Sequence, residues 1–373
     1  MSQNQIVYHS VIAENNRETY GEFDVVDFRC QFPTRSMNLN SVRLTGTFSV
    51  KDETGSQVVA QSCQMDELVG SHSFLSQVQT FVGGVSVDNI LEYPRMVKMI
   101  TSATENPADM FNSGNICELK APCQSVAEEL LRQEGIKSQQ GTPVKRDLDF
   151  SCKPMISLNQ VVGDKRTLSY TKSGDVRMVF TLARNNAVLF GLNVVEGFSY
   201  TLSDLRVEFT SYPDDGDTST PIMYKRRQGL KQSFASTTAQ LNFNFPMMAN
   251  RVYGSYLPQA DENIPAKNNL ALAKPPSVST ITFFWNNATN EYISYQLRSQ
   301  PEIIERYIDA LGDNGSNSAS LMNIANNNAY GCGLDLGETV DLMATKLSVV
   351  IESGLQSDTP MLLYLYSEGI AQM

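Results

Sequence analysis

Residues 198–209 read FSYTLSDLRVEF, and apolar and polar side chains alternate along almost the whole stretch. Alternation with a period of two places the apolar side chains on one face of a β-strand and the polar ones on the other. The apolar phase changes once, between Leu202 and Leu205, so we expect a bulge or kink at Ser203 and Asp204. The stretch predicts a long, half-buried strand with one irregularity.

The same alternation recurs on both sides of this stretch and predicts that strands dominate the fold. Its apolar members are Val26, Phe28, Cys30 and Phe32; Val42, Leu44, Phe48 and Val50; Val176, Met178, Phe180 and Leu182; Leu241, Phe243 and Phe245; Ile281, Phe283 and Trp285; Ile293, Tyr295 and Leu297; and Leu347, Val349 and Ile351. Residues 361–366 are apolar on both faces of the expected strand. Residues 280–286 and 291–298 flank a short Asn-rich connection and predict a hairpin.

Helices are expected to be few. Capping boxes begin predicted helices at Ser125 and Ser299, and Gly312 ends the second of them. A third helix is expected over residues 94–103, with a proline in its first turn. Because regular strand–helix alternation is absent, the pattern favours antiparallel sandwiches with short helical insertions over a parallel α/β sheet.

The length of 373 residues exceeds the size at which single cores usually stop growing, so two domains are expected. Residues 213–221, PDDGDTSTP, have the composition of a solvated connection. We therefore expect an N-terminal arm over residues 1–19, a first sandwich over 20–212, a linker over 213–221 and a second sandwich over 222–373.

Composition and charge exclude several classes of protein. The net charge of −11 argues against a chain-wide footprint for nucleic acid. With 41% hydrophobic and 18% charged residues, the chain is too apolar to be disordered. Its apolar runs are far shorter than the roughly 20 residues of a membrane-spanning helix, and residues 1–19 do not have the pattern of a signal peptide. We expect synthesis and folding in a cytosol.

The sequence offers little for catalysis or metal binding. It has two histidines, His9 and His72, and neither is near a second candidate ligand in sequence. No P-loop, nucleophile elbow, HExxH or dinucleotide fingerprint occurs. Six cysteines with no zinc or redox spacing are expected to be buried, reduced thiols: Cys30, Cys63, Cys117, Cys123, Cys152 and Cys332. We assign no catalytic residue, no cofactor and no metal ligand.

Two charged clusters in and after the linker each leave two interpretations open. Asp214, Asp215 and Asp217 offer oxygen ligands that suit calcium, but they lack a full calcium loop, and a solvated linker is the alternative. The basic side chains that follow are Lys225, Arg226, Arg227 and Lys231. They fit contact with phosphates, anionic lipid or an acidic patch of a neighbour, or else the solvated start of a strand.

The N-terminal segment carries apolar residues among polar ones, namely Ile6, Val7, Tyr8, Val11 and Ile12. No partner strand is evident nearby in sequence. Such an arm often becomes ordered on a neighbouring subunit, and the alternative is a frayed terminus.

The chain over residues 20–369 resembles the double jelly-roll major capsid proteins of tailless icosahedral viruses of the adenovirus and tectivirus lineage. The segments that carry the resemblance are CKPMISLNQV (152–161), GDVRMVFTL (174–182), YTLSDLRVEF (200–209), LKQSFASTTAQLNFNFP (230–246), RVYGSYLPQ (251–259), NAYGCGLDLG (328–337), KLSVVIES (346–353) and TPMLLYLYSEG (359–369). The order of these segments carries it more than any single motif.

The resemblance implies an all-β fold of two consecutive eight-stranded antiparallel jelly-roll sandwiches. It implies a structural protein and not an enzyme, whose homotrimers form pseudo-hexameric capsomers of a virion shell. The implied partners are further copies, minor capsid or penton proteins and, in some members, an internal viral membrane, without sequence-specific nucleic acid. The residues expected to serve assembly are Ile6, Val7, Val11, Ile12, Lys225, Arg226 and Arg227.

The alternative is a two-domain β-sandwich that binds or cleaves carbohydrate. Sugar sites usually stack rings on exposed aromatic side chains. The single tryptophan, Trp285, lies within an alternating strand, where burial in the core is expected.

Overall fold

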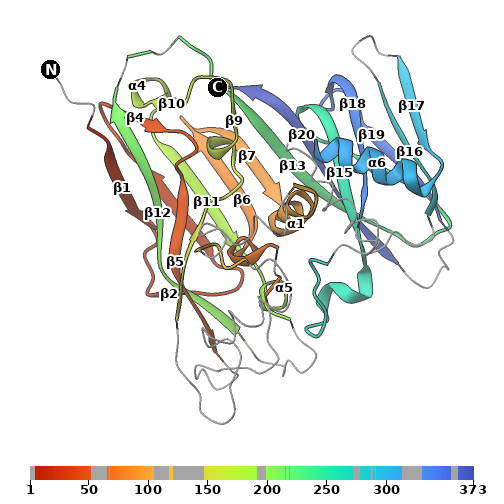
Figure 1. The fold of residues 1–373 in the computed structure, drawn as a ribbon, viewed down its shortest axis with the longest axis horizontal. Coiled ribbons are helices and arrows are strands. Elements are labelled where there is room, and N and C mark those ends of the chain that lie inside the picture. The colour runs from red at the N-terminus through yellow and green to blue at the C-terminus, as the bar shows by residue number, and fades with distance from the viewer. Residues whose placement is uncertain are drawn as a thin grey trace.

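The computed structural model describes residues 5–51, 65–66, 68–104, 117–120, 147–190, 199–214, 216–217, 219–271, 278–286, 289, 291–312, 330–353 and 360–373. Within them the chain forms three β-sheets arranged as two sandwiches side by side (Figure 1). The expected helix starting at Ser125, the thiols Cys63 and Cys123, and Asp215 lie outside the described residues.

A seven-stranded sheet forms the outer layer of the first sandwich. Its strands are β1 (Val7–Ile12), β2 (Thr19–Tyr20), β4 (Arg35–Asn38), β5 (Arg43–Lys51), β8 (Leu148–Cys152), β10 (Thr167–Ser169) and β12 (Ser199–Pro213). The order is β10-β4-β12-β5-β8, and β1 and β2 both pair with β12.

A nine-stranded sheet runs through both sandwiches in the order β18-β15-β20-β13-β7-β6-β11-β3, with β9 also paired to β13. Its strands are β3 (Val25–Cys30), β6 (Leu75–Val82), β7 (Val85–Leu91), β9 (Val161–Val162), β11 (Val176–Leu182), β13 (Met223–Phe234), β15 (Met248–Pro258), β18 (Cys332–Asp341) and β20 (Met361–Gln372). A four-stranded sheet in the order β14-β19-β16-β17 completes the second sandwich. It contains β14 (Thr238–Phe243), β16 (Val278–Asn286), β17 (Tyr292–Leu297) and β19 (Leu347–Ser353).

The two sandwiches have the same strand order. In the second, where β13 to β20 are the first to eighth strands, one layer reads sixth, third, eighth, first (β18-β15-β20-β13) and the other second, seventh, fourth, fifth (β14-β19-β16-β17). In the first, β8-β5-β12-β1 and β3-β11-β6-β7 repeat both orders when β1 is the first strand and the short strands β2, β4, β9 and β10 are counted as additions. This is the double Greek key of a jelly roll, so the expected fold of two jelly-roll sandwiches is confirmed.

Local features of the sequence appear where they were expected. Strands β12 and β5 change register between Ser203 and Arg206, and Asp204 has a φ of 51°, so the bulge is confirmed. Strands β16 and β17 pair as the expected hairpin. All of the first nine residues of β20 are buried, because this strand is covered on both faces.

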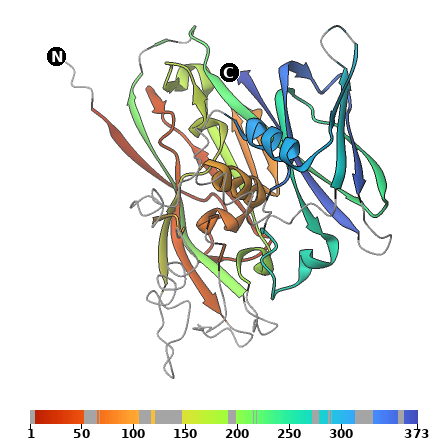
Figure 2. The ribbon, with the colours of Figure 1, turned by 45° about the vertical axis from the view of Figure 1, so that its right-hand side comes forward.

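Short helices connect the strands. The described helices are η1 (Gly70–Phe74), α1 (Tyr93–Thr104), η3 (Ser157–Asn159), α4 (Tyr170–Ser173), α5 (Asn185–Val188), η4 (Gln259–Asn263) and α6 (Gln300–Leu311). Helix α6 begins with the predicted capping box, in which the side chain of Ser299 accepts a hydrogen bond from the backbone N–H of Glu302, and it ends at Gly312. Turning the molecule shows that α6 lies next to α1 (Figure 2).

The N-terminal segment has a partner strand within its own chain. Strand β1 pairs antiparallel with β12, from Val7 opposite Ser211 to Ile12 opposite Arg206. The partner lies about 200 positions away in sequence, which is why alternation along residues 1–19 did not reveal it. Strand β12 ends at Pro213 and β13 begins at Met223, so the predicted linker falls between two long strands, and its role as a domain boundary stays a prediction.

Candidate functional site

The two jelly rolls meet where β7 and α1 of the first unit contact β13 and β20 of the second, and we call this contact the joint. Strand β7 of the first unit and β13 of the second run parallel, and Gln228 is paired with Asn89. Gly229 allows the close approach, because a Cβ at this position would lie 2.8 Å from the carbonyl oxygen of Leu91 and 2.5 Å from the ring of Tyr366. The two units are therefore joined by backbone as well as by side chains.

Helix α1 begins directly after β7 and carries a buried arginine across the joint. The guanidinium of Arg95 donates a hydrogen bond to the backbone oxygen of Asn269 and lies 4.2 Å from the ring centroid of Tyr364. Arg95 is only 3% exposed, so its charge is stabilised by the aromatic face and by that carbonyl rather than by water. In addition, the hydroxyl of Tyr366 donates to the backbone oxygen of Glu92, 2.8 Å away.

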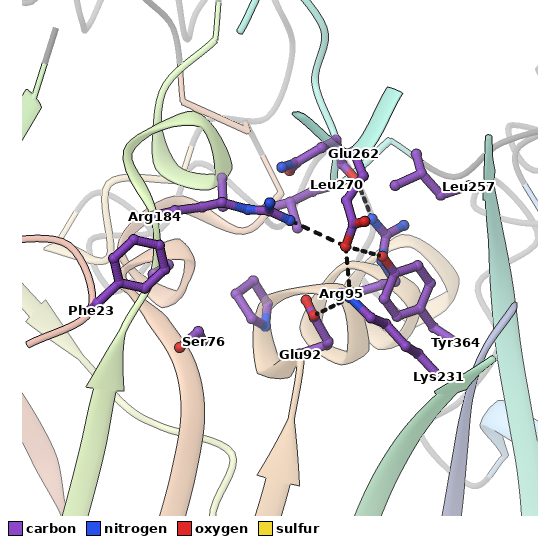
Figure 3. A pocket seen from close by; sticks show the side chains of 14 residues that line it. Phe23, Ser76, Glu92, Arg95, Arg184, Lys231, Leu257, Glu262, Leu270 and Tyr364 are labelled. Atoms are coloured by element: carbon purple, nitrogen blue, oxygen red, sulfur yellow. Dashed lines mark hydrogen bonds and ion pairs between the residues drawn. The ribbon is translucent and has the colours of Figure 1, made fainter. Parts of the chain in front are cut away.

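A pocket of about 380 Å³ opens at this joint, and charged side chains from both units meet in it (Figure 3). Glu262 accepts a hydrogen bond from Lys231 at 2.7 Å and from the hydroxyl of Tyr364 at 3.3 Å, and its carboxylate lies 3.3 Å from Arg184. Lys231 also reaches Glu92 at 3.5 Å. Glu262 thereby links the first unit, through Arg184, to the second.

The charged side chains of this pocket are suited to holding the two units together rather than to proton transfer. Burial alone would raise the pKa of Glu262, but the hydrogen bond and charge of Lys231, together with Arg184, outweigh it and hold the pKa below its usual value. A carboxylate that stays ionised and fully engaged at neutral pH is a poor general acid or base. The geometry therefore supports a structural joint.

The predicted basic cluster lies at the start of β13, and part of it is neutralised within the chain. Arg227 is buried, and its Nε lies 2.6 Å from a carboxylate oxygen of Glu368 on β20. Lys225 approaches the same carboxylate at 3.7 Å. Burial would raise the pKa of Glu368, but the charges of Arg227 and Lys225 outweigh this and lower it. Arg226 is half-buried beside them.

The other predicted assembly residues lie on β1 or, in the case of Ile6, directly before it, at the opposite side of the molecule from β17 (Figure 1). Val7 and Val11 are half-buried, whereas Ile6 and Ile12 are exposed. Tyr8, between them, is 81% exposed. In the described part of the chain β1 has a hydrogen-bonded neighbour on one side only, β12. The structure thus separates the two predicted groups of assembly residues: one lies near the joint and the other on a free sheet edge.

The acidic cluster in the linker is engaged by hydroxyl groups and a lysine. Asp214 accepts hydrogen bonds from Ser36, Ser169 and Thr171 at 2.9–3.0 Å. Asp217 accepts one from Lys165 at 2.6 Å. Among the described residues, no group of His, Cys, Asp or Glu side chains is arranged to hold a metal ion.

Buried titratable side chains in the first unit form an enclosed network. His72 Nδ1 lies 2.8 Å from the hydroxyl of Tyr93 and 3.4 Å from Cys152 Sγ, and its Nε2 lies 3.3 Å from Glu118. Burial raises the pKa of the Cys152 thiol, and both Cys152 and His72 are inaccessible to solvent. A thiol that stays protonated and enclosed is not a nucleophile. His72, buried between Tyr93, Cys152 and Glu118, has a structural role in this network.

The cysteines and the tryptophan bear on two further expectations. Cys30, Cys152 and Cys332 are free and buried, as expected, but Cys117 is exposed, so the expectation that all six thiols are buried is wrong. Cys117 directly precedes a turn at Glu118 and Leu119 and does not lie within an alternating strand. Trp285 is 5% exposed, which confirms its burial and leaves it unable to stack on a sugar ring. In the described residues we find no helix that is long and apolar enough to cross a bilayer.

Comparison with known proteins supports the fold. No family model and no curated protein matches the chain. Among solved structures, the Faustovirus major capsid protein aligns over 100% of this chain and 91% of its own, with a TM-score of 0.60 at 8% identity. A quasi-atomic model of the PBCV-1 virus capsid aligns over 100% and 95%, with a TM-score of 0.55 at 10% identity. The Sputnik virophage structure aligns over 100% and 89%, with a TM-score of 0.56 at 11% identity.

These neighbours belong to one structural class, the double jelly-roll major capsid proteins of large DNA viruses and virophages. The present chain has the fold of that class along its whole length. At such low identity the likeness concerns the fold.

Proposed function

We propose that the chain is a structural major capsid protein whose homotrimers form pseudo-hexameric capsomers that tile an icosahedral virion shell. The observation that carries this proposal is the repetition of one strand order in two jelly rolls that share a sheet. Three such chains around a threefold axis present six similar units, and this near-sixfold outline packs into a shell without requiring six copies.

The proposal assigns the chain no catalytic activity. The charged side chains at the joint are engaged with one another, and the buried network around His72 and Cys152 is closed to substrates. In this proposal these side chains stabilise the folded chain.

The proposed partners follow from the same role. The chain associates with further copies of itself and, at special positions of the shell, with minor capsid or penton proteins. An internal viral membrane beneath the shell belongs to this proposal as a further partner, and sequence-specific nucleic acid does not. The proposed location is the virion, after synthesis in the host cytosol.

The test is the molar mass of the purified chain, measured by light scattering coupled to size-exclusion chromatography. The proposal requires a species of three times the chain mass that persists on dilution, because trimers of such chains bury large interfaces. Electron micrographs of this species should show a hexagonal outline. A monomer at all concentrations, or a dimer, would overturn the proposal.

A further inference from the structure

The two outer edges of the molecule are formed by the strands that correspond to the two strands of the joint, but in the described residues these edge strands lack the matching partner. In the first unit the fifth strand, β7, is paired with β6 on one side and with β13, the first strand of the second unit, on the other. In the second unit the fifth strand, β17, pairs with β16. In the first unit the first strand, β1, pairs with β12. Within the described residues, neither β17 nor β1 pairs with a second strand.

Resting on the proposed homotrimer, we infer that β17 of one copy lies beside β1 of the next copy and repeats between chains the joint that β7 and β13 make within a chain. The four-stranded sheet of one copy then continues into the seven-stranded sheet of its neighbour. Such a contact joins two different surfaces, so it is heterologous and closes only as a ring.

Exposed apolar side chains support this assignment on both edges. On β1 the side chains of Tyr8 and Ile12 are exposed, and so is that of Ile6 directly before the strand. On β17, Tyr292 is 68% exposed. Exposed sheet edges with apolar side chains are a liability in a monomer, because they template pairing with other chains. A neighbouring copy that covers both edges removes this liability.

The charged residues that follow the two edge strands also support the placement of β17 beside β1. Within the chain, Glu92 is the first residue after β7, and it meets Lys231 on β13 across the joint. Arg298 is the first residue after β17, and it is exposed. Close after β1 lie two exposed acidic residues, Glu14 and Glu18. At the joint the acidic residue follows the fifth strand and the basic residue lies on the first strand. Between copies the basic residue follows the fifth strand and the acidic residues follow the first, so the charges are again opposite.

The test uses cysteines at two exposed serines, Ser10 on β1 and Ser294 on β17, in a Cys117→Ser background. The double variant S10C/S294C, treated with a short bis-maleimide, should give covalent dimers and trimers and no larger species, because a ring of three is closed. Each single variant should give no more crosslinking than the Cys117→Ser background, because a heterologous contact never brings two copies of one surface together. Co-expressed single variants should give dimers and no trimers.

The outcomes separate this inference from the proposed function. A trimeric mass without crosslinks in the double variant would overturn the inference and leave the trimer standing. Crosslinking of either single variant to itself would also overturn it, because it would show an isologous contact. A monomeric mass would overturn the proposed function and the inference together. Both serines are exposed, so the substitutions leave the fold intact, which circular dichroism of each variant checks.

Discussion

The guanidinium of Arg95, on α1 of one jelly roll, lies 4.2 Å from the ring centroid of Tyr364, on the last strand of the other. The contact is buried and is reinforced by the hydrogen bond from Arg95 to the backbone oxygen of Asn269. A single side chain thus connects three segments from the two units. Its position at the joint makes the stability of each unit depend on the other.

Arg95→Leu should lower the free energy of unfolding by about 1–3 kcal/mol. It removes the cation–π contact and leaves the Asn269 carbonyl without its donor. Arg206→Leu, at an exposed position of β12, is the control and should change stability by less than about 0.5 kcal/mol. Urea denaturation followed by the fluorescence of Trp285 reports on the second unit directly. Equal midpoints for the two variants would contradict the role assigned to Arg95.

Gly229→Ala should destabilise the joint by about 1–3 kcal/mol, because the added methyl group meets the Tyr366 ring and the Leu91 carbonyl oxygen. The matched control is Gly21→Ala, where the nearest atom to the new Cβ is 3.9 Å away. Thermal unfolding of both variants measures the difference. A Gly229→Ala protein as stable as the Gly21→Ala protein would show that β7 and β13 are not held as closely as described.

The pairing of Glu368 with Arg227 should make stability depend on acid. The pKa of Glu368 is lowered in the folded chain, so its contribution is complete above the unfolded value of about 4.5 and is lost as the pH falls through the folded pKa. Glu368→Gln should cost about 3–5 kcal/mol at neutral pH, because Arg227 is left buried without its partner. The variant should also lose less stability between pH 5 and pH 3 than the wild type.

Urea midpoints at a series of pH values test this prediction. Glu338→Gln, at an exposed position of β18 in the same sheet, is the control and should follow the wild-type pH profile. If Glu368→Gln and the wild type had parallel profiles, the carboxylate would not be the group responsible.

Tyr8→Asp should weaken association between copies without changing the stability of the chain. Tyr8 is 81% exposed on β1, so the isolated fold loses no packing, whereas a charge at a covered edge opposes the contact. Met343→Asp, at a residue that is 64% exposed and on neither edge, is the control. Light scattering over a dilution series should show dissociation at higher concentration for Tyr8→Asp only. Identical profiles for the two variants would argue against β1 as a contact surface.

Cys117 should react with iodoacetamide at neutral pH in the folded protein, whereas Cys30, Cys152 and Cys332 should not. Cys117 is exposed, and the other three are buried. Burial raises the pKa of Cys30 to about 12, so its reactive thiolate is scarce as well as inaccessible. Peptide mass spectrometry before and after denaturation measures the labelling. Labelling of Cys152 in the native state would contradict the enclosed network around His72.

Much of the fold could be predicted from local patterns. The bulge at Asp204 followed from a change of phase, and the start of α6 from a capping box at Ser299. These features depend on residues that are close in sequence. The pairing of β1 with β12 and of β7 with β13 depends instead on backbone hydrogen bonds between distant segments, which leave no spacing to recognise.

The joint was invisible in the sequence for the same reason. Glu92, Lys231 and Glu262 belong to three separate segments, and only folding brings them together. The basic cluster was noticed, but its partner Glu368 lies 141 positions from Arg227, so the sequence could not distinguish a solvated cluster from a buried ion pair.

The nine-stranded sheet has a mechanical consequence. Because its strand pairing continues from β6 and β7 into β13 and β20, a rotation of one jelly roll about residues 213–221 would break the pairing of Asn89 with Gln228 and draw Arg95 away from Tyr364. We therefore expect the two jelly rolls of a chain to move together as one rigid body. In any larger assembly of such chains, changes in local curvature have to be taken up at the seams between chains.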